Sequence, residues 1–209
     1  MFVLRRNDAT FDQTNIIFAL DSISAFALLQ SSVHQVWALR QGASLESRPR
    51  YTPTDCFETF PFPPESPASL LALGTEYHAK RQRFLLSERK GLTDFYNLFH
   101  DPDCSALRIT EVRELHRQID EQVLAAYCWA DILPSHDFQT LPHLPENDRI
   151  RYTICEDARL AILRRLSQLN RQRWQREQEE EQRLAAEQSG SRQKRRAKLS
   201  LSVINGRLF

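Results

Sequence analysis

The residues with chemically reactive side chains are scattered along the chain rather than grouped. Four cysteines stand at positions 56, 104, 128 and 155, and no two of them form a Cys-x-x-Cys pair. Zinc sites need thiolates or imidazoles at short spacing, and the nearest candidate is His100 with Cys104, beside Asp101 and Asp103. We interpret this run as a polar loop between two helices, and we expect no metal ligand in the chain.

Sequence motifs of the common enzyme classes are also missing. The chain has no Gly-x-Ser-x-Gly turn for a nucleophilic serine, and it has neither a Walker loop nor a Gly-x-Gly-x-x-Gly fingerprint. Carboxylates are plentiful, but spacing alone does not make two of them an acid/base couple. His34 and His116 lie in expected helices, where we interpret them as packed or surface imidazoles. We therefore assign no catalytic and no cofactor-binding residue.

The composition is that of a soluble globular chain rich in helices. Its 209 residues include 28 Lys+Arg and 27 Asp+Glu, a formal net charge of +1, and 41% are hydrophobic, which is ordinary for globular proteins. Only 5 residues are glycine, which disfavours glycine-rich phosphate loops and favours helices. No apolar window approaches the ~18 residues of a membrane span, and Met1 to Asp8 has no secretion signal behind it. We expect a cytoplasmic protein with no membrane partner.

Residues 1–65 mix several element types. The branched apolar run from Asn15 to Leu20 predicts a buried strand, and the apolar spacing from Ile23 to Arg40 predicts a helix. Five prolines follow between Arg48 and Pro64. Because proline disrupts helices and cannot donate to a strand ladder, we expect an ordered, extended segment rich in aromatic residues.

Residues 66–176 have the periodicity of a helical region. Apolar stripes lie at Leu70, Leu73, Tyr77 and Phe84, at Val112, Leu115, Ile119, Val123 and Tyr127, and at Ala158, Ile162, Leu166 and Leu169. Each stripe covers one face, so these helices need one another or a partner. The predicted fold class is mainly α: short N-terminal strands and a helix, the extended segment, a bundle-like region and a long C-terminal helix.

Residues 177–209 form a charged tail in this interpretation. The apolar stripe ends near Trp174, Ser189-Gly190-Ser191 predicts a break in the helix, and a basic run from Arg192 to Lys198 follows. That run would bind any polyanion weakly, although its composition favours a flexible, solubilising tail.

The proline-rich segment is too specific for a linker. It begins Arg48-Pro49-Arg50-Tyr51-Thr52-Pro53 and continues to Phe57-Glu58-Thr59-Phe60-Pro61-Phe62-Pro63. With Phe18-Ala19-Leu20-Asp21 before it and Phe99-His100-Asp101-Pro102 after it, it resembles the C-terminal part of adenine-specific DNA methyltransferases of the type IIG restriction–modification kind. The resemblance covers roughly residues 11 to 175. It implies the end of a target-recognition domain in residues 1–65 and a helical spacer in residues 66–176.

The resemblance also implies where catalysis would lie. In such enzymes a separate Rossmann-like domain binds S-adenosylmethionine and transfers the methyl group next to an Asn-Pro-Pro-Tyr or similar motif. The only Pro-Pro here, at 63–64, is followed by Glu65, so that motif is missing. The implied partners are double-stranded DNA and a catalytic methyltransferase chain, which would hold the S-adenosylmethionine. The alternative is an inactive helical interaction module or gene remnant that binds no DNA.

Basic residues are the candidate DNA contacts, because a second domain must hold the duplex while the target base is extruded. Arg48 and Arg50 either reach a phosphate or a guanine edge or only keep the segment soluble. The other candidates are Lys80, Arg81, Arg83, Arg89 and Lys90, which either line DNA or form solvated helix surface. The structural motif comprises Tyr51, Phe57, Phe60, Pro61, Phe62 and Pro63. Its phenylalanines are interpreted as core anchors in preference to base-stacking platforms.

Overall fold

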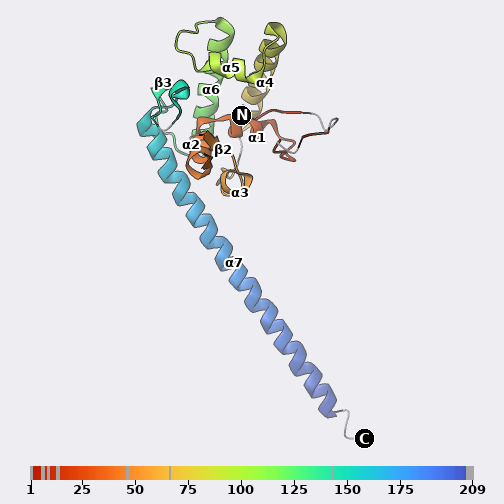
Figure 1. Cartoon of the computed structure of the whole chain (residues 1–209). Helices are drawn as coiled ribbons and strands as arrows, with labels where there is room; N and C mark the ends of the chain where they lie inside the picture. The colour runs from red at the N-terminus through yellow and green to blue at the C-terminus, as the bar shows by residue number, and fades with distance from the viewer. Residues whose placement is uncertain are drawn as a thin grey trace. The chain divides into compact units, whose positions relative to one another are not determined.

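The computed structural model describes residues 2–5, 8, 10–12, 15–45, 48–65, 67–142 and 144–205, and its description leaves out the side chains of 43–45, 48, 49 and 188–205. Two compact units are present, Met1–Leu166 and Ser167–Phe209. The chain is mainly α with two small hairpins and a long last helix (Figure 1), which confirms the predicted fold class. Within the described ranges, no helix has the length and apolarity to cross a membrane.

The helix predicted from Ile23 to Arg40 is in fact two helices, α1 (Ile23–Gln30) and α2 (Ser32–Gln41). Ser31 separates them because its backbone is extended, with φ −64° and ψ 154°. Its hydroxyl accepts a hydrogen bond from the backbone N–H of His34 at 3.3 Å. Ser31 therefore caps the N-terminus of α2, a role that the apolar spacing alone does not reveal.

The strand predicted at residues 15–20 is wrong, since these residues form no strand and pair with no described strand. The first hairpin lies further along, where β1 (Ala43–Leu45) pairs antiparallel with β2 (Arg48–Arg50). The proline-rich segment is also less extended than predicted. It contains the one-turn helix α3 (Pro53–Cys56), whose proline occupies the first helical turn, where no N–H is needed.

The core of the first unit lies where α1 packs on α4 (Ala68–Glu88) and on α6 (Leu107–Ala126). The helix α5 (Leu92–Phe99) adds two buried rings, Phe95 and Phe99. Gly74 permits the close approach of α4 to α1, because a Cβ there would lie 2.9 Å from the carbonyl oxygen of Ile23. The predicted apolar stripes of α4 and α6 are buried at Leu70, Tyr77 and Phe84, and at Val112, Leu115, Ile119, Val123 and Tyr127.

A second hairpin and the last helix follow. Strands β3 (Asp137–Thr140) and β4 (Ile150–Thr153) pair antiparallel around the short 3-10 helix η1 (Glu146–Asp148). The sequence pattern did not predict this hairpin. The helix α7 spans Glu156–Asn205. The break predicted at residues 189–191 is therefore wrong, since a single glycine costs a helix only about 1 kcal/mol. The three-part division at residues 65 and 176 stays a prediction.

Candidate nucleic-acid interface

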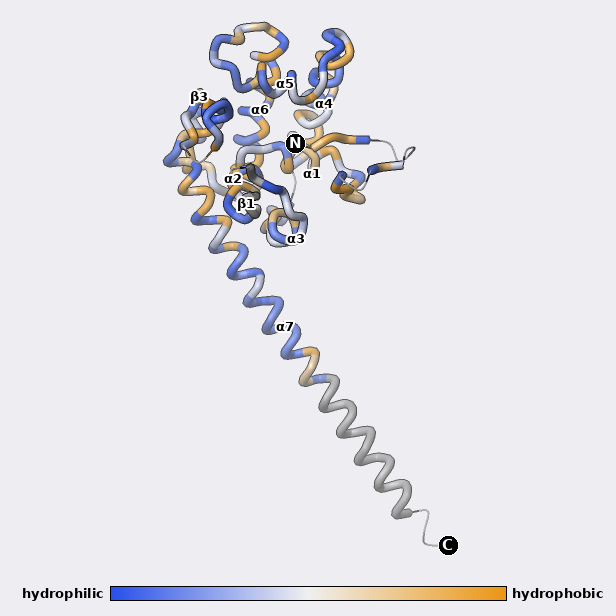
Figure 2. Tube along the Cα trace, in the orientation of Figure 1, coloured by the Kyte–Doolittle hydropathy of each residue, from blue (hydrophilic) through white to orange (hydrophobic). Residues whose placement is uncertain are grey.

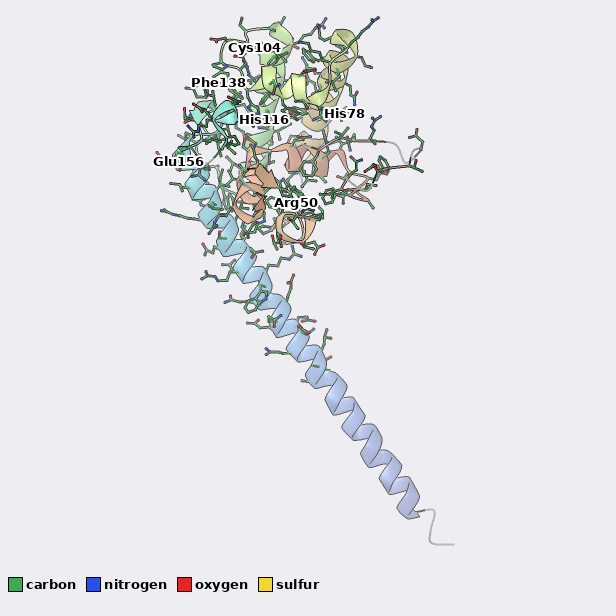
Figure 3. The ribbon with its side chains drawn as sticks, viewed as in Figure 1. Arg50, His78, Cys104, His116, Phe138 and Glu156 are labelled. Atoms are coloured by element: carbon green, nitrogen blue, oxygen red, sulfur yellow. The ribbon has the colours of Figure 1, made fainter. Side chains whose placement is uncertain are left out.

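The β1–β2 hairpin presents Arg50, which is exposed (Figure 3). Its backbone pairs with that of Ala43 at the base of the hairpin. Gly42 holds this base against the end of α2, because a Cβ on Gly42 would lie 2.8 Å from the Arg50 carbonyl oxygen. The Arg48 side chain lies outside the described residues. The hairpin therefore presents one described cation, Arg50, at the end of β2, where the backbone is closely packed against Gly42.

Tyr51 fixes the next part of the segment. Its hydroxyl lies 3.3 Å from Nε2 of His34, and its ring meets that of Phe2 edge to face at 5.5 Å. Nδ1 of His34 lies 3.1 Å from the carbonyl oxygen of Leu29, so this nitrogen carries the proton and Nε2 accepts from Tyr51. Burial lowers the pKa of His34 to about 4, which keeps the ring neutral near pH 7 and preserves this arrangement.

The Phe-Glu-Thr-Phe-Pro-Phe-Pro run is attached by rings and by two hydrogen bonds. Phe60 is fully buried and packs edge to face on His34 at 4.9 Å. The hydroxyl of Tyr127, from the end of α6, donates to the carbonyl oxygen of Pro61 at 2.8 Å. The indole N–H of Trp37 donates to Oγ1 of Thr59 at 3.1 Å. The segment is thus fixed to α2 and to the C-terminal end of α6.

The three phenylalanines of this run differ in exposure. Phe60 is fully buried, Phe57 is half-buried, and the Phe62 side chain is 38% exposed. Phe62 still touches the other two rings, at 5.4 Å and 5.0 Å between centroids. Pro61 is buried and Pro63 is partly buried. The anchor interpretation therefore fits Phe60 best, and Phe62 is the ring with the most surface to offer a ligand.

Arg81 is buried although it belongs to the basic stretch of α4. Its guanidinium donates to the Tyr96 hydroxyl and to the Phe2 carbonyl oxygen, both at 2.9 Å. Its guanidinium carbon lies 5.4 Å from the ring centre of Phe26 and 5.5 Å from that of Tyr77. Arg81 therefore links the N-terminal segment to α4 and α5. Because its side chain is fully buried, it cannot contact a phosphate, and we no longer count it among the candidate DNA contacts.

The remaining α4 candidates fall into two groups. Lys80 is engaged by two carboxylates, Glu111 at 2.8 Å and Glu76 at 3.5 Å. Arg83, Arg89 and Lys90 are exposed at the C-terminal end of α4. None of these three takes part in an ion pair within the described part of the chain. Arg89 adopts a left-handed conformation, with φ 52°, and ends the helix there. This end of α4 therefore offers three cations to an anionic partner.

The loop containing His100 and Cys104 is organised by an arginine. The guanidinium of Arg113 donates to the carbonyl oxygens of Leu98, Phe99, Asp101 and Cys104 at 2.8 to 2.9 Å. His100 accepts the backbone N–H of Tyr152 through Nδ1 at 3.1 Å. No group of three metal-binding side chains occurs among the residues that the structure describes. The residues that flank Pro102 are therefore a loop wrapped around Arg113.

A buried polar network joins the N-terminal part of the chain to the helical region. Asp120, on α6, accepts the backbone N–H of Ser32 at 2.7 Å through Oδ1, and its Oδ2 lies 2.7 Å from Nε2 of His136. Nε2 of His116 lies 3.1 Å from Oγ of Ser32 (His116 is labelled in Figure 3). A negative carboxylate is thereby held at the positive N-terminal end of α2. Sequence reasoning missed this network, because Ser32 and Asp120 are 88 positions apart.

The network is not a serine-hydrolase triad. The closest carboxylate oxygen of Asp120 is 3.7 Å from Nε2 of His116, the same ring nitrogen that faces Ser32, whereas a triad needs the carboxylate on the other nitrogen. Burial lowers the pKa of His116. Burial alone would raise the pKa of Asp120, but His116, His136 and the Ser32 N–H together lower it. The arrangement is a charged, structural link.

Comparison with known proteins bears on the N-terminal part of the chain. Residues 2–64 match the family model described as "MmeI, target recognition domain". The match covers the hairpin and the proline-rich segment, and it ends directly after Pro63-Pro64. It confirms the resemblance to the target-recognition region of type IIG restriction–modification enzymes and supports a role in DNA recognition. The match does not extend into the helical region. The comparisons with curated proteins and with solved structures gave no match.

Proposed function

We propose that this chain is the DNA-recognition and helical-spacer portion of an adenine-specific DNA methyltransferase of a restriction–modification or phage-defence system. The observation that carries the proposal is the match of residues 2–64 to a target-recognition domain. The packing of that region supports it, since Arg50 lies at the end of β2 and the residues that follow it are fixed to the core. A rigid mount reduces the conformational entropy that a DNA contact would otherwise cost.

Arg50 and the C-terminal end of α4 serve as the DNA contacts in this proposal. Arg50 reaches a phosphate or a guanine edge, which a guanidinium can bind through two parallel hydrogen bonds. Arg83, Arg89 and Lys90 are exposed cations that contact phosphates without reading sequence. With a formal charge of +1, attraction to DNA comes from local groups of cations rather than from the chain as a whole.

Helices α4, α5 and α6 serve as the spacer. The carboxylate of Asp120 and the guanidinium of Arg81 each bind the backbone of the N-terminal part, so the recognition region and the spacer move together. Methyl transfer is assigned to a separate catalytic chain that binds S-adenosylmethionine. In this proposal that chain also supplies the Asn-Pro-Pro-aromatic motif.

Co-expression with the product of the adjacent gene tests this proposal. A pull-down with tagged chain should recover a methyltransferase polypeptide, and the pair should methylate adenine in duplex DNA. The Arg50→Ala pair should keep its assembly and lose methylation, whereas a Glu58→Ala pair, altered at an exposed acid of the same segment, should retain both. Failure of the chain to bind DNA either alone or in the pair would favour the inactive interaction module.

A further inference from the structure

The stretch Ser167–Arg176 of α7 differs in composition from the turns of the helix that directly follow it. It contains Arg171, Arg173 and Arg176, four amide side chains and no acidic residue. The acidic run begins immediately after it at Glu177, and Glu179, Glu180 and Glu181 follow. Figure 2 shows this part of the helix as predominantly hydrophilic. The ten residues therefore carry three positive charges on a helix whose next turns are negative.

The side chains of this stretch are available to a partner. Gln168, Arg171 and Gln175 are all exposed, and their spacing of three and then four residues places them on one face of the helix. Arg171 and Arg176 take part in no ion pair among the residues that the structure describes, whereas Arg173 is bound to Glu177 at 2.8 Å. Trp174, beside this face, is 59% exposed. The stretch presents unneutralised cations, amides and an aromatic ring.

We infer that Ser167–Arg176 is a second DNA-binding element, which contacts duplex DNA with Gln168, Arg171 and Gln175 toward the groove and Arg176 toward a phosphate. This inference rests on the proposed role in DNA recognition. Arginine pairs with guanine and glutamine with adenine through base edges in the major groove. From Gln168 to Gln175 the helix rises about 10 Å, which matches about three base pairs. A helix about 10 to 12 Å wide fits the major groove.

The charge reversal after Arg176 limits the length of the contact. Duplex DNA carries a phosphate charge every ~1.7 Å, so the run from Glu177 to Glu181 would be repelled if it lay along the same groove. The helix therefore enters the duplex with its first part and leaves it before the acidic turns. A second copy of this chain that packed in parallel would bring arginine against arginine, and the test below distinguishes a second copy from DNA.

Binding of the full chain to a labelled duplex tests the inference. A duplex of about 30 base pairs and mixed sequence is titrated at about 50 mM salt and above, with anisotropy as the readout. Arg171→Ala, which removes the groove contact, should lower the affinity by about three- to tenfold. Arg176→Ala, which removes the phosphate contact, should reduce the slope of log K against log salt by ~0.9. Arg183→Ala is the matched control: it removes the same charge from the same helix at an exposed position already paired with Glu180.

Trp174 gives a readout confined to this stretch, since Trp37 and Trp129 are buried. The duplex should protect the tryptophan emission of the full chain from acrylamide quenching, and Trp174→Phe should abolish that protection. If the chain binds DNA but Arg171→Ala equals Arg183→Ala and Trp174 stays accessible, the inference is wrong and the proposed function stands. If no duplex binds alone or with the catalytic chain, the proposed function fails. Concentration-dependent shielding of Trp174 without DNA would identify a second copy as the occupant and overturn the inference.

Discussion

Two arginines of the first unit and two of the second are bound in opposite ways. In the first unit, Arg81 and Arg113 are buried and donate to carbonyl and hydroxyl oxygens from distant parts of the sequence. In the second unit, Arg173 and Arg183 are exposed and pair with glutamates three or four residues away on the same helix. The number of basic residues in a stretch therefore says little about DNA binding. What matters is whether each guanidinium already has partners inside the fold.

The largest expected effect concerns the anchor of the recognition segment. Phe60→Ala should lower the free energy of unfolding by about 3 to 5 kcal/mol, because it leaves a cavity at a fully buried ring. Urea denaturation followed by circular dichroism measures the change. Phe62→Ala is the matched control in the same run, and we expect a loss of about 1 kcal/mol, mainly from ring–ring contacts. Equal losses of stability in the two variants would show that Phe60 is not more deeply buried than Phe62.

Arg81 comes next, because its removal breaks contacts among three parts of the first unit. Arg81→Ala should destabilise the fold by roughly 2 to 4 kcal/mol, since it leaves the Phe2 carbonyl and the Tyr96 hydroxyl short of a donor and removes two cation–π contacts. Arg83→Ala, two residues along the same helix at an exposed position, should leave stability nearly unchanged. In a DNA-binding assay with folded protein, Arg83→Ala should bind DNA more weakly than Arg81→Ala.

The sequence predicted the elements whose evidence is local. The stripe of Val112, Ile119 and Val123 is buried in α6 as its spacing required. Helical spacing also predicts the burial of Arg81, because it lies four residues after Tyr77 and three before Phe84, on the apolar stripe of α4. The basic composition around it obscured that position. The burial of a charged side chain depends on partners, and here those come from residue 2 and from α5.

The rest of the site could not be derived from local pattern. Asp120 and His116 are four residues apart on the buried side of α6, which hints at a polar pair. Their partner Ser32, however, lies in a helix that periodicity alone merged with its neighbour. The second hairpin was not predicted, because Pro134, Pro142 and Pro145 indicate a loop and each of the two strands has only four residues. Short strands are specified by pairing across a turn rather than by their own composition.

The pH dependence of the first unit should expose its buried imidazoles. Burial lowers the pKa of His34 to about 4 and that of His100 to about 3, whereas an unfolded histidine titrates near 6.5. Between these values the unfolded chain binds more protons, so stability is complete above pH ~6.5 and falls as the pH drops. At pH 5 each group should cost about 2 kcal/mol. Urea midpoints at pH 7 and pH 5 measure the loss.

His100→Asn tests one of these two groups. Asparagine can still accept the Tyr152 N–H that His100 Nδ1 accepts, but it does not titrate in this range. Whatever its stability at pH 7, the variant should lose less stability than the parent between pH 7 and pH 5. An identical loss in both proteins would mean that His100 is protonated in the folded state as readily as in the unfolded state.

The smallest effect should come from the second unit, where it sharpens the contrast with Arg81. Arg173→Ala removes an ion pair whose two side chains are 51% and 57% exposed. Exposed pairs at this spacing contribute only about 0.3 to 0.5 kcal/mol, and alanine is itself a strong helix former. We therefore expect no resolvable change in the urea midpoint and no loss of helical circular dichroism. A loss comparable to that of Arg81→Ala would mean that Arg173 has a partner beyond its own helix, and the contrast between these two arginines would then not hold.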